Sequence, residues 1–474
     1  MYTLHYFLDV DIIEKILEDV SYYSLWPDMK DEDCLVLAII YDYIMRNYQK
    51  RAQLPNDREL PQPSLTYILT NSGRVILCPS GTEVFLAVEE SIHGMRVQIA
   101  ASVARIRVRQ QVGSLRLLLP EEWRQAELYS EEMPFYGWYN QLVGKQDIVT
   151  GWLNNMGFRR VVIGKTPSPM EYCSDKHCPD SFVFNSADRQ MIFESEIVDQ
   201  KNLDKSNCFA LHCTLAMAGG GEEIMFVNTT NLLSAIHMEG LLGNKFPMVL
   251  PVPTIRIIRT IREDEDNKLA TKMGSKVTRA SSEEFYLVEP GNEKNRQIRH
   301  IFLEATDNRS GVINPIDYLE AESDDINILR DMWLLPGNPA KEARNLEMNI
   351  KTTNLLKHAL KFNNVRSITF LSHHKNLEDV ESLVLKVLEA QNKALIKETE
   401  LISVKQPTTV PAFGLTVPLM PALQEEREAL EAGQPSVITD SKMVHFPAGP
   451  NNNAFTVCCI VKEVGGISII YQFK

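Results

Sequence analysis

The pattern of hydrophobic and polar residues changes twice along the first quarter of the chain. From residue 9 to about residue 51, apolar positions recur at helical spacing, which predicts a small helical bundle. Between residues 65 and 88 the pattern becomes three β-prone runs, separated by Asn-Ser-Gly and Pro-Ser-Gly turn signals. We interpret this stretch as a β-rich insertion. Helical spacing returns over residues 95–111.

Residues 120–205 predict a small α/β module, with a helix in DIVTGWLNNMGF and strands in RRVVIG, DSFVFN and QMIFES. From residue 206 strands alternate with helical stretches, the order expected of a parallel sheet with crossover helices. The candidate strands are 222–228, 254–261, 284–290, 296–305 and 366–373. Residues 405–450 predict a long loop, and the closing runs AFTVCCIVKE and GISIIYQFK predict an antiparallel strand pair at the edge of the sheet.

The stretch RSITFLSHHKNLEDVESLV, at 366–384, combines a buried strand, a turn with two histidines and an amphipathic helix. Open α/β sheets bind their ligands where strands end and helices begin. Ser372, His373 and His374 therefore occupy an expected ligand position.

Composition and charge restrict the classes of partner. The 474 residues carry a formal charge of -13, which argues against a surface that grips nucleic acid over its whole extent. The most basic local segment is the helix near residue 100, followed by one further arginine. Its arginines are Arg96, Arg105, Arg107, Arg109 and Arg116. Two interpretations stay open: a solvated helix face, or a patch that contacts RNA phosphates.

The N-terminus mixes acids with its apolar residues, so it does not have the pattern of a signal peptide, and the longest apolar run is too short to span a bilayer. These features predict an intracellular protein, cytoplasmic or nuclear, with no membrane partner. Eight cysteines in such a chain favour reduced thiols. The pattern Cys173-x3-His177-Cys178 recurs as Cys208-x3-His212-Cys213, but it lacks a C-x2-C knuckle, so we expect buried cysteines and no metal site.

Six segments carry a resemblance to a known family, and they occur in its order along nearly the whole chain. They are LPEEWRQAEL with MPFYGWYN, DKHCPDSFVF, IMFVNTTNLLSAIHM, SGVINPIDYL, LLKHALKF and LEDVESLV. The sequence resembles the NOP/Sun family of RNA cytosine-5 methyltransferases, and most closely a divergent branch of it.

The resemblance implies three domains. These are a helical NusB-like domain (1–119, with the β-rich insertion near 65–88), a small RNA-recognition-like α/β module (120–205), and a class I, Rossmann-like methyltransferase domain (206–474, with a loop excursion at 405–450). It also implies S-adenosylmethionine as cofactor and an RNA substrate, tRNA or rRNA. In that chemistry one cysteine thiolate adds to C6 of cytosine and a second cysteine assists product release.

Both family cysteines are replaced in this sequence. Arg309 precedes Ser310 and Gly311 where the D-A-P-C-S-G loop would carry the first cysteine. If the loop is aligned from its acid instead, Glu304 takes the place of the aspartate and two residues are inserted, and neither alignment supplies a cysteine. His373 occupies the position of the nucleophile. No cysteine occurs between Cys213 and Cys458. The remaining candidates for proton transfer in this region are His374, Glu304 and Asp307, besides His373.

The cofactor loop differs as well. Where the family has C-A-A-P-G-x-K-T, this chain has Asn228, Thr229 and Thr230, without the glycine that lets a backbone approach a nucleotide-type ligand. The acid expected to hold the ribose could only be Glu263 or Asp264, and Glu304 is a further cofactor candidate. Binding of S-adenosylmethionine is therefore expected only from the resemblance.

The sequence favours a pseudoenzyme: a methyltransferase fold without its thiols, retained as an RNA-binding or protein-binding module. Two alternatives remain. One is an active S-adenosylmethionine-dependent RNA methyltransferase that uses groups other than cysteine. The other is a structural, partner-binding protein that does not contact RNA.

Overall fold

The structure is a computed structural model, and it divides the chain into two compact units, Met1–Glu131 and Glu132–Lys474. The units are described separately. The residues that the structure describes are 10–49, 66–69, 75–78, 82–118, 121, 124, 128–129, 133–144, 146–164, 166–193, 204–229, 232–248, 254–258, 263–313, 339–403, 421–434, 436–437, 443–463 and 466–469.

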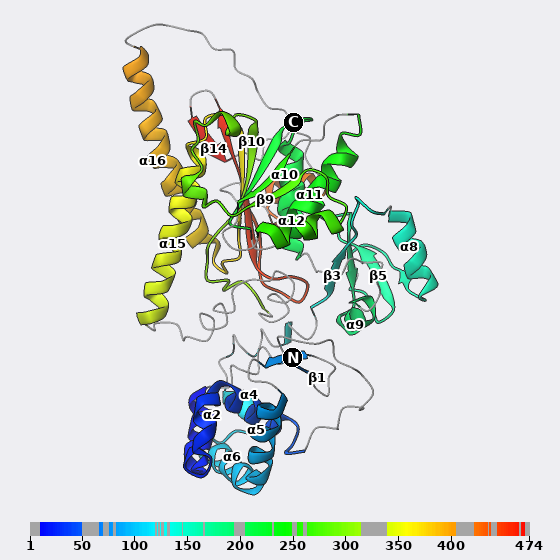
Figure 1. The fold of residues 1–474 in the computed structure, drawn as a ribbon, viewed down its shortest axis with the longest axis vertical. Coiled ribbons are helices and arrows are strands. Elements are labelled where there is room, and N and C mark those ends of the chain that lie inside the picture. Colours follow the sequence, from blue (N-terminus) through cyan, green and yellow to red (C-terminus); the bar gives the residue numbers. More distant parts are fainter. Residues whose placement is uncertain are drawn as a thin grey trace. The chain divides into compact units, whose positions relative to one another are not determined.

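The N-terminal unit is helical with one β-hairpin (Figure 1). Its helices are α2 (Val10–Asp19), α3 (Tyr22–Leu25), η1 (Pro27–Glu32), α4 (Asp33–Met45), α5 (Thr82–Gly94), α6 (Arg96–Gln110) and η2 (Leu115–Leu118). The hairpin pairs β1 (Thr66–Leu69) with β2 (Val75–Cys78) and lies within the predicted β-rich stretch. The third β-prone run of that stretch, EVFLAV, is wrong as a strand, because its apolar side chains belong to α5, which packs Val88 into the helical core. The likeness of this unit to NusB stays a prediction.

The second unit begins with a four-stranded sheet in the order β3-β6-β5-β4. Its elements are β3 (Phe135–Trp138), α8 (Gln146–Asn155), β4 (Arg159–Arg160), β5 (Glu171–Ser174), β6 (Ser181–Phe184), η3 (Ser186–Asp188) and α9 (Arg189–Phe193). The predicted helix and two of the predicted strands are present. QMIFES is wrong as a strand: its first residues lie in α9, where Ile192 is buried among the aromatic side chains of the sheet.

The large sheet has the order β12-β13-β11-β10-β7-β8-β9, and β14 also pairs with β13. Its strands are β7 (Glu223–Val227), β8 (Ile255–Ile258), β9 (Thr278–Ser281), β10 (Ile298–Glu304), β11 (Ser367–Ser372), β12 (Val444–Phe446), β13 (Phe455–Glu463) and β14 (Gly466–Ile469). Strands β9, β8, β7, β10 and β11 are parallel and follow the Rossmann order 3-2-1-4-5. This mixed α/β sheet is consistent with a methyltransferase fold.

One expectation about this sheet needs correction, and another is confirmed. The segment 284–290 is not a strand, because Phe285–Leu287 forms the short helix η4, and the edge strand is the preceding β9. The predicted antiparallel strand pair is confirmed: β13 pairs with β14 at the other end of the sheet, β13 runs antiparallel to β11, and β12 also pairs with β13. The predicted loop 405–450 contains the helix α17 (Pro421–Glu431) and β12, while residues 404–420 lie outside the described part.

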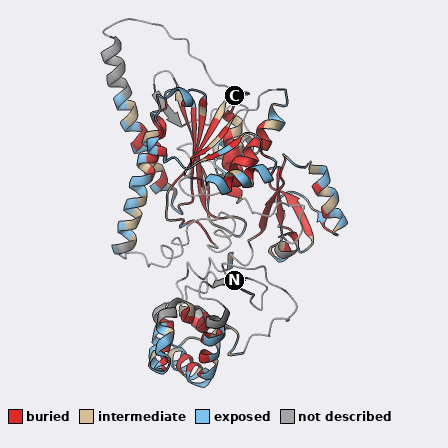
Figure 2. Ribbon diagram, viewed as in Figure 1, coloured by how far each residue is buried: buried red, intermediate tan, exposed pale blue. Residues whose placement is uncertain are grey.

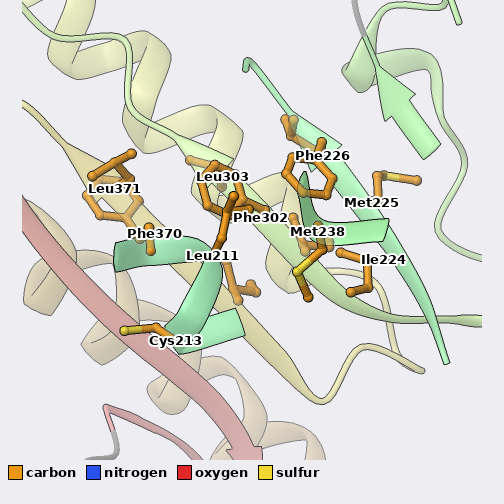
Figure 3. Packing of buried hydrophobic residues seen from close by; sticks show 14 of the residues in the cluster. Leu211, Cys213, Ile224, Met225, Phe226, Met238, Phe302, Leu303, Phe370 and Leu371 are labelled. Atoms are coloured by element: carbon orange, nitrogen blue, oxygen red, sulfur yellow. The ribbon is translucent and has the colours of Figure 1, made fainter. Parts of the chain in front are cut away.

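Helices cover both faces of the large sheet. Figure 1 shows α10 (Lys205–Met217), α11 (Leu232–Lys245) and α12 (Glu263–Lys272) on one side, and α15 (Pro339–Leu360) and α16 (Leu377–Ser403) on the other. The central strands β7, β10 and β11 are buried over nearly their whole length, as the red arrows of Figure 2 show. In Figure 3, Phe226 and Phe302 from adjacent strands stack on one another, and Phe370 of β11, Leu211 of α10 and Met238 of α11 belong to the same buried cluster. This core fixes where each strand ends, and so fixes the positions of the residues that follow it.

Candidate active site at the ends of β10 and β11

The structure brings together Arg309 and His373, the two residues that the sequence resemblance aligns with the family cysteines. Strands β10 and β11 are parallel neighbours with Glu304 opposite Leu371, so their carboxyl ends meet at the same edge. The loop after β10 carries Asp307 and Arg309, and the loop after β11 carries His373. Arg309 and His373 are 64 residues apart in sequence, and their side chains are in direct contact.

Arg309 is the centre of a buried polar network. One guanidinium nitrogen, Nη2, donates to Glu304 Oε1 at 2.7 Å, and the other, Nη1, lies 2.9 Å from His373 Nδ1. A second carboxylate, Asp307, is 3.6 Å from Nη1. The arginine is 5% exposed and has a left-handed backbone, with φ of 50°, which is uncommon for a residue with a side chain. The local backbone therefore holds a buried arginine at the position that the sequence resemblance aligns with a cysteine.

His373 is a neutral imidazole held from both sides. Its side chain has no exposed surface, and burial, followed by the neighbouring Arg309 guanidinium, lowers the pKa of His373 to about 3 despite the opposing effect of Asp307. Since an arginine can only donate, Nδ1 accepts from Arg309. The proton is then on Nε2, which donates to Ser206 Oγ at 2.7 Å, and Ser206 in turn donates to Asp204 Oδ2 at 2.5 Å.

Asp307 joins the two loops. Its Oδ2 accepts from the Ser372 hydroxyl and from the His373 backbone N–H, both at 2.7 Å, and its Oδ1 accepts from the Arg309 backbone N–H at 3.0 Å. Burial raises the pKa of Asp307, but Arg309, His373 and these hydrogen bonds outweigh it, so the pKa is lower than usual. The loops are also fastened by the Gly311 N–H, which donates to the His373 carbonyl at 2.8 Å.

His374 differs from its neighbour. Its side chain is 20% exposed, and Nδ1 accepts from the backbone N–H of Asn376 at 3.2 Å, just before α16 begins. Asp379, in the first turn of that helix, lies 3.8 Å from Nδ1. Of the two histidines, only His374 is placed where a molecule outside the protein could reach it.

The predicted cofactor residues fall into two groups. Asn228 and Thr229 follow β7, and the Asn228 amide donates to the Glu304 carbonyl at 2.8 Å and to Thr306 Oγ1 at 3.1 Å, from a left-handed backbone with φ of 58°. Thr229 is 3% exposed, and Thr230 lies outside the described residues. Glu263 and Asp264 begin α12, and Glu263 accepts from the backbone N–H and the hydroxyl of Ser282. Asn228 and Glu304 thus meet at one edge, while Glu263 contacts the residue after β9.

Ser206 and Asp204 also belong to the site, although no motif in the sequence points to a functional role for them. Asp204 is the N-cap of α10, where its side chain accepts from the Ser206 backbone N–H at 3.1 Å. An Asp-x-Ser start could have located the beginning of this helix. Nothing local in the sequence indicates that Ser206 bonds a histidine 167 residues away.

The predicted basic patch lies on α6 of the N-terminal unit. Arg96, Arg105, Arg107 and Arg109 are exposed, and Arg105 forms an ion pair with Asp19 of α2 at 2.5 Å. The side chain of Arg116 lies outside the described ones.

The repeated cysteine and histidine residues are buried in the second unit. Cys173, Cys178, Cys208 and Cys213 are buried thiols that form no disulfide. Burial raises the pKa of each of the first three above its usual value, and for Cys213 a hydrogen bond with Cys459 is the largest cause, followed by burial. His212 pairs with Asp180, which also contacts His237 at 2.5 Å. In the part of the chain that the structure describes, no group of such side chains is arranged to hold a metal ion, and no helix is long and apolar enough to cross a membrane.

Comparison with known proteins gives three related sequences, each named "Putative methyltransferase NSUN7". The mouse protein (Mus musculus) is 24% identical over 392 residues, which are 81% of this chain and 50% of that protein. The human protein (Homo sapiens) is 23% identical over 386 residues, with the same coverage, and the macaque protein (Macaca fascicularis) is 25% identical over 309 residues, 64% of this chain and 43% of its own. No family model matches the chain. The chain spans about half the length of the curated relatives that it matches.

Proposed function

Starting from the chain as a divergent, NSUN7-like relative of the NOP/Sun methyltransferases, we propose that it is a pseudoenzyme of that family. It does not methylate cytosine, and it acts as a binding module for RNA or for a protein. The observation that carries the proposal is the contact between Arg309 and His373, the residues at the two family cysteine positions.

The contact between Arg309 and His373 fills the position at which a catalytic cysteine would have to reach the pyrimidine ring. Addition to C6 of a pyrimidine needs a soft thiolate that can touch the ring. His373 has no exposed surface, and both of its ring nitrogens are engaged, by Arg309 and by Ser206. A neutral imidazole with a pKa of about 3 is also a weak base at neutral pH. The arrangement therefore supports neither covalent catalysis nor general base catalysis by His373.

The same network argues against an active methyltransferase that uses other groups here. Glu304 has no exposed surface and is paired with Arg309, and the two oxygens of Asp307 accept hydrogen bonds from the loops. These carboxylates are structural partners of the guanidinium and of the backbone. His374 is the remaining candidate, and an activity that depended on it would be lost in His374→Ala.

S-adenosylmethionine is the methyl donor that the family resemblance implies, and the residues proposed to hold it do not fit that role as placed. The Asn228 amide is bonded to the end of β10, the Glu304 carboxylate to Arg309, and the Glu263 carboxylate to Ser282. A ribose or amino-acid group would have to displace these partners. We therefore derive no methyl-transfer step for this chain.

If the chain binds RNA, it does so at a surface other than the small sheet, because that sheet does not expose aromatic side chains of β3, β5 or β6 on which bases could stack. RNA-recognition modules stack bases on exposed aromatic residues of their sheet. In β3, β5 and β6 every residue is buried, including the aromatic Tyr136, Tyr172 and Phe184. An RNA target, tRNA or rRNA by analogy with the family, and a protein partner are both proposals at this stage.

Covalent trapping tests the loss of catalysis. An RNA containing 5-fluorocytidine would trap a cysteine adduct, because fluorine at C5 blocks the elimination that releases the enzyme. We expect the wild-type chain, incubated with this RNA and S-adenosylmethionine, to form no adduct that survives denaturing electrophoresis. Titration calorimetry with S-adenosylmethionine should likewise show no binding at about 100 μM. A stable adduct, or binding in the micromolar range, would contradict the pseudoenzyme proposal.

A further inference from the structure

Helix α6 of the N-terminal unit carries two apolar stripes on opposite sides. The first consists of Ile99, Val103 and Ile106, which pack into the helical core of that unit. The second consists of Val97, Ala101, Ala104 and Val108, all exposed, with Val97 69% and Val108 80% exposed. Because successive helical residues turn by about 100°, these four positions fall within about 60° of one another. Figure 2 shows the outward faces of this unit's helices in pale blue.

Arginines border the exposed stripe on both sides. By the same helical geometry Arg105 and Arg109 fall on one side of it, and Arg96 and Arg107 fall on the other. Helix α6 contains no acidic residue, whereas the chain as a whole has a formal charge of -13. Asp19 of α2 pairs with Arg105, so part of the charge on one border is already neutralised. The helix thus presents an apolar centre with cationic borders.

The stripe has the dimensions of a helix-packing site. Val97 and Val108 are eleven positions apart, about 16 Å along the axis, which matches three turns of a second helix. Between them the small side chains of Ala101 and Ala104 leave room for close approach, and the two valines form ridges at the ends.

The chemistry of the stripe favours a protein over RNA. Single-stranded RNA is held by aromatic side chains on which bases stack, and the centre of this face is aliphatic throughout. An amphipathic helix with an apolar stripe and acidic flanks satisfies both the apolar centre and the arginine borders.

We propose that the exposed face of α6 is a docking site for an acidic amphipathic helix of a partner protein. The face lies entirely in the unit Met1–Glu131, so this inference does not depend on the fate of the methyltransferase-type site. The apolar stripe supplies most of the contact area, and the arginines orient the partner and make its binding dependent on salt.

The test uses the full-length chain and two synthetic helical peptides. The first peptide has leucines at i, i+3, i+4 and i+7 with glutamates on the flanks, and the second has the same composition with the leucines distributed around the helix. We expect fluorescence anisotropy to show binding of the first peptide only. Val97→Gln with Val108→Gln should weaken it by about tenfold, since two buried contacts are lost. Arg107→Gln with Arg109→Gln should weaken it and reduce its salt dependence.

The control experiments distinguish binding of an acidic helix at this face from binding elsewhere on the chain and from binding of other partners. Val162→Gln, which changes a valine that is also 80% exposed but lies in the small α/β module, should leave binding unchanged. Equal binding of both peptides, no binding of either, or insensitivity to the Val97 and Val108 changes would each overturn the proposal. A 12-nucleotide uridine RNA that competes with the peptide and depends on the arginines alone would assign the face to RNA. Self-association abolished by the valine changes would assign it to a second copy.

Discussion

Replacing Arg309 by Met should destabilise the second unit strongly, because it removes the positive charge from a buried acidic site. Arg309 lies 2.7 Å from Glu304 and 3.6 Å from Asp307, and Glu304 has no exposed surface. Removing one partner of a buried ion pair typically costs about 3–5 kcal/mol, since the remaining charge stays in a medium of low polarity. His373 would also lose the hydrogen bond that its Nδ1 accepts.

The loss of stability is best measured at the amides of β10 and β11, the strands that carry the network. Native-state hydrogen exchange of the β10 and β11 amides reports on opening of the second unit without requiring the whole chain to unfold in two states. We expect the protection of these amides to fall by about 3 kcal/mol or more in Arg309→Met. Changes in the helical N-terminal unit should be negligible, which provides an internal control.

A double substitution checks the reasoning. If the cost comes from the uncompensated carboxylate, Glu304→Gln combined with Arg309→Met should be more stable than Arg309→Met alone, with a coupling of about 1–3 kcal/mol. A loss below about 1 kcal/mol for the single variant, or strictly additive losses, would refute the view that this pair is an essential buried network.

Three further predictions concern other parts of the second unit. Gly311→Ala should lower the free energy of unfolding by about 1–3 kcal/mol, because its Cβ would lie 2.5 Å from the Ala454 carbonyl oxygen. Gly291→Ala is the matched control, since its Cβ would meet no atom within 4 Å and should change stability little. Thermal melts of the two variants check the difference. Glu239→Ala should release β9 from α11, because Glu239 accepts from the Lys276 and Thr278 backbone N–H groups, and faster exchange of those amides would reveal it. The His300 hydrogen bond is the largest cause that lowers the pKa of Glu222, to about 2. The stability that ionised Glu222 contributes is therefore complete above its ordinary pKa of 4.5 and is lost as the pH falls towards 2. Glu222→Gln should flatten the dependence of the melting temperature on pH in that range.

The sequence predicted the buried parallel strands well, because each is a short apolar run that the sheet buries on both faces. The β7, β10 and β11 segments are of this kind. The strand β9, TRAS, has little apolar pattern, and its place is set by Glu239 of α11, whose carboxylate accepts from three successive backbone N–H groups, those of residues 276–278. The local pattern cannot reveal that bond, and the nearby apolar run 284–290 has the more strand-like sequence.

The sequence predicts where the residues of the candidate site lie along the strands, but not how they contact one another. The sequence located Arg309 and His373 at strand ends, and strand ends of a parallel sheet meet at one edge. It did not predict that the two side chains bond one another, nor that Ser206 completes the network. Those contacts depend on the twist of the sheet and on the packing of α10 against β11, which are long-range properties.

The contact between Arg309 and His373 also determines how hard it would be to introduce a cysteine nucleophile at either position. A cysteine at position 309 alone would leave Glu304 charged and buried beside a thiol, and a cysteine at position 373 alone would leave the guanidinium against a small apolar side chain. Each single change passes through a less stable protein, and only several simultaneous changes avoid that penalty. The present arrangement is therefore separated from one with two cysteines by a stability barrier, so that stepwise introduction of cysteines should begin with a change at Glu304.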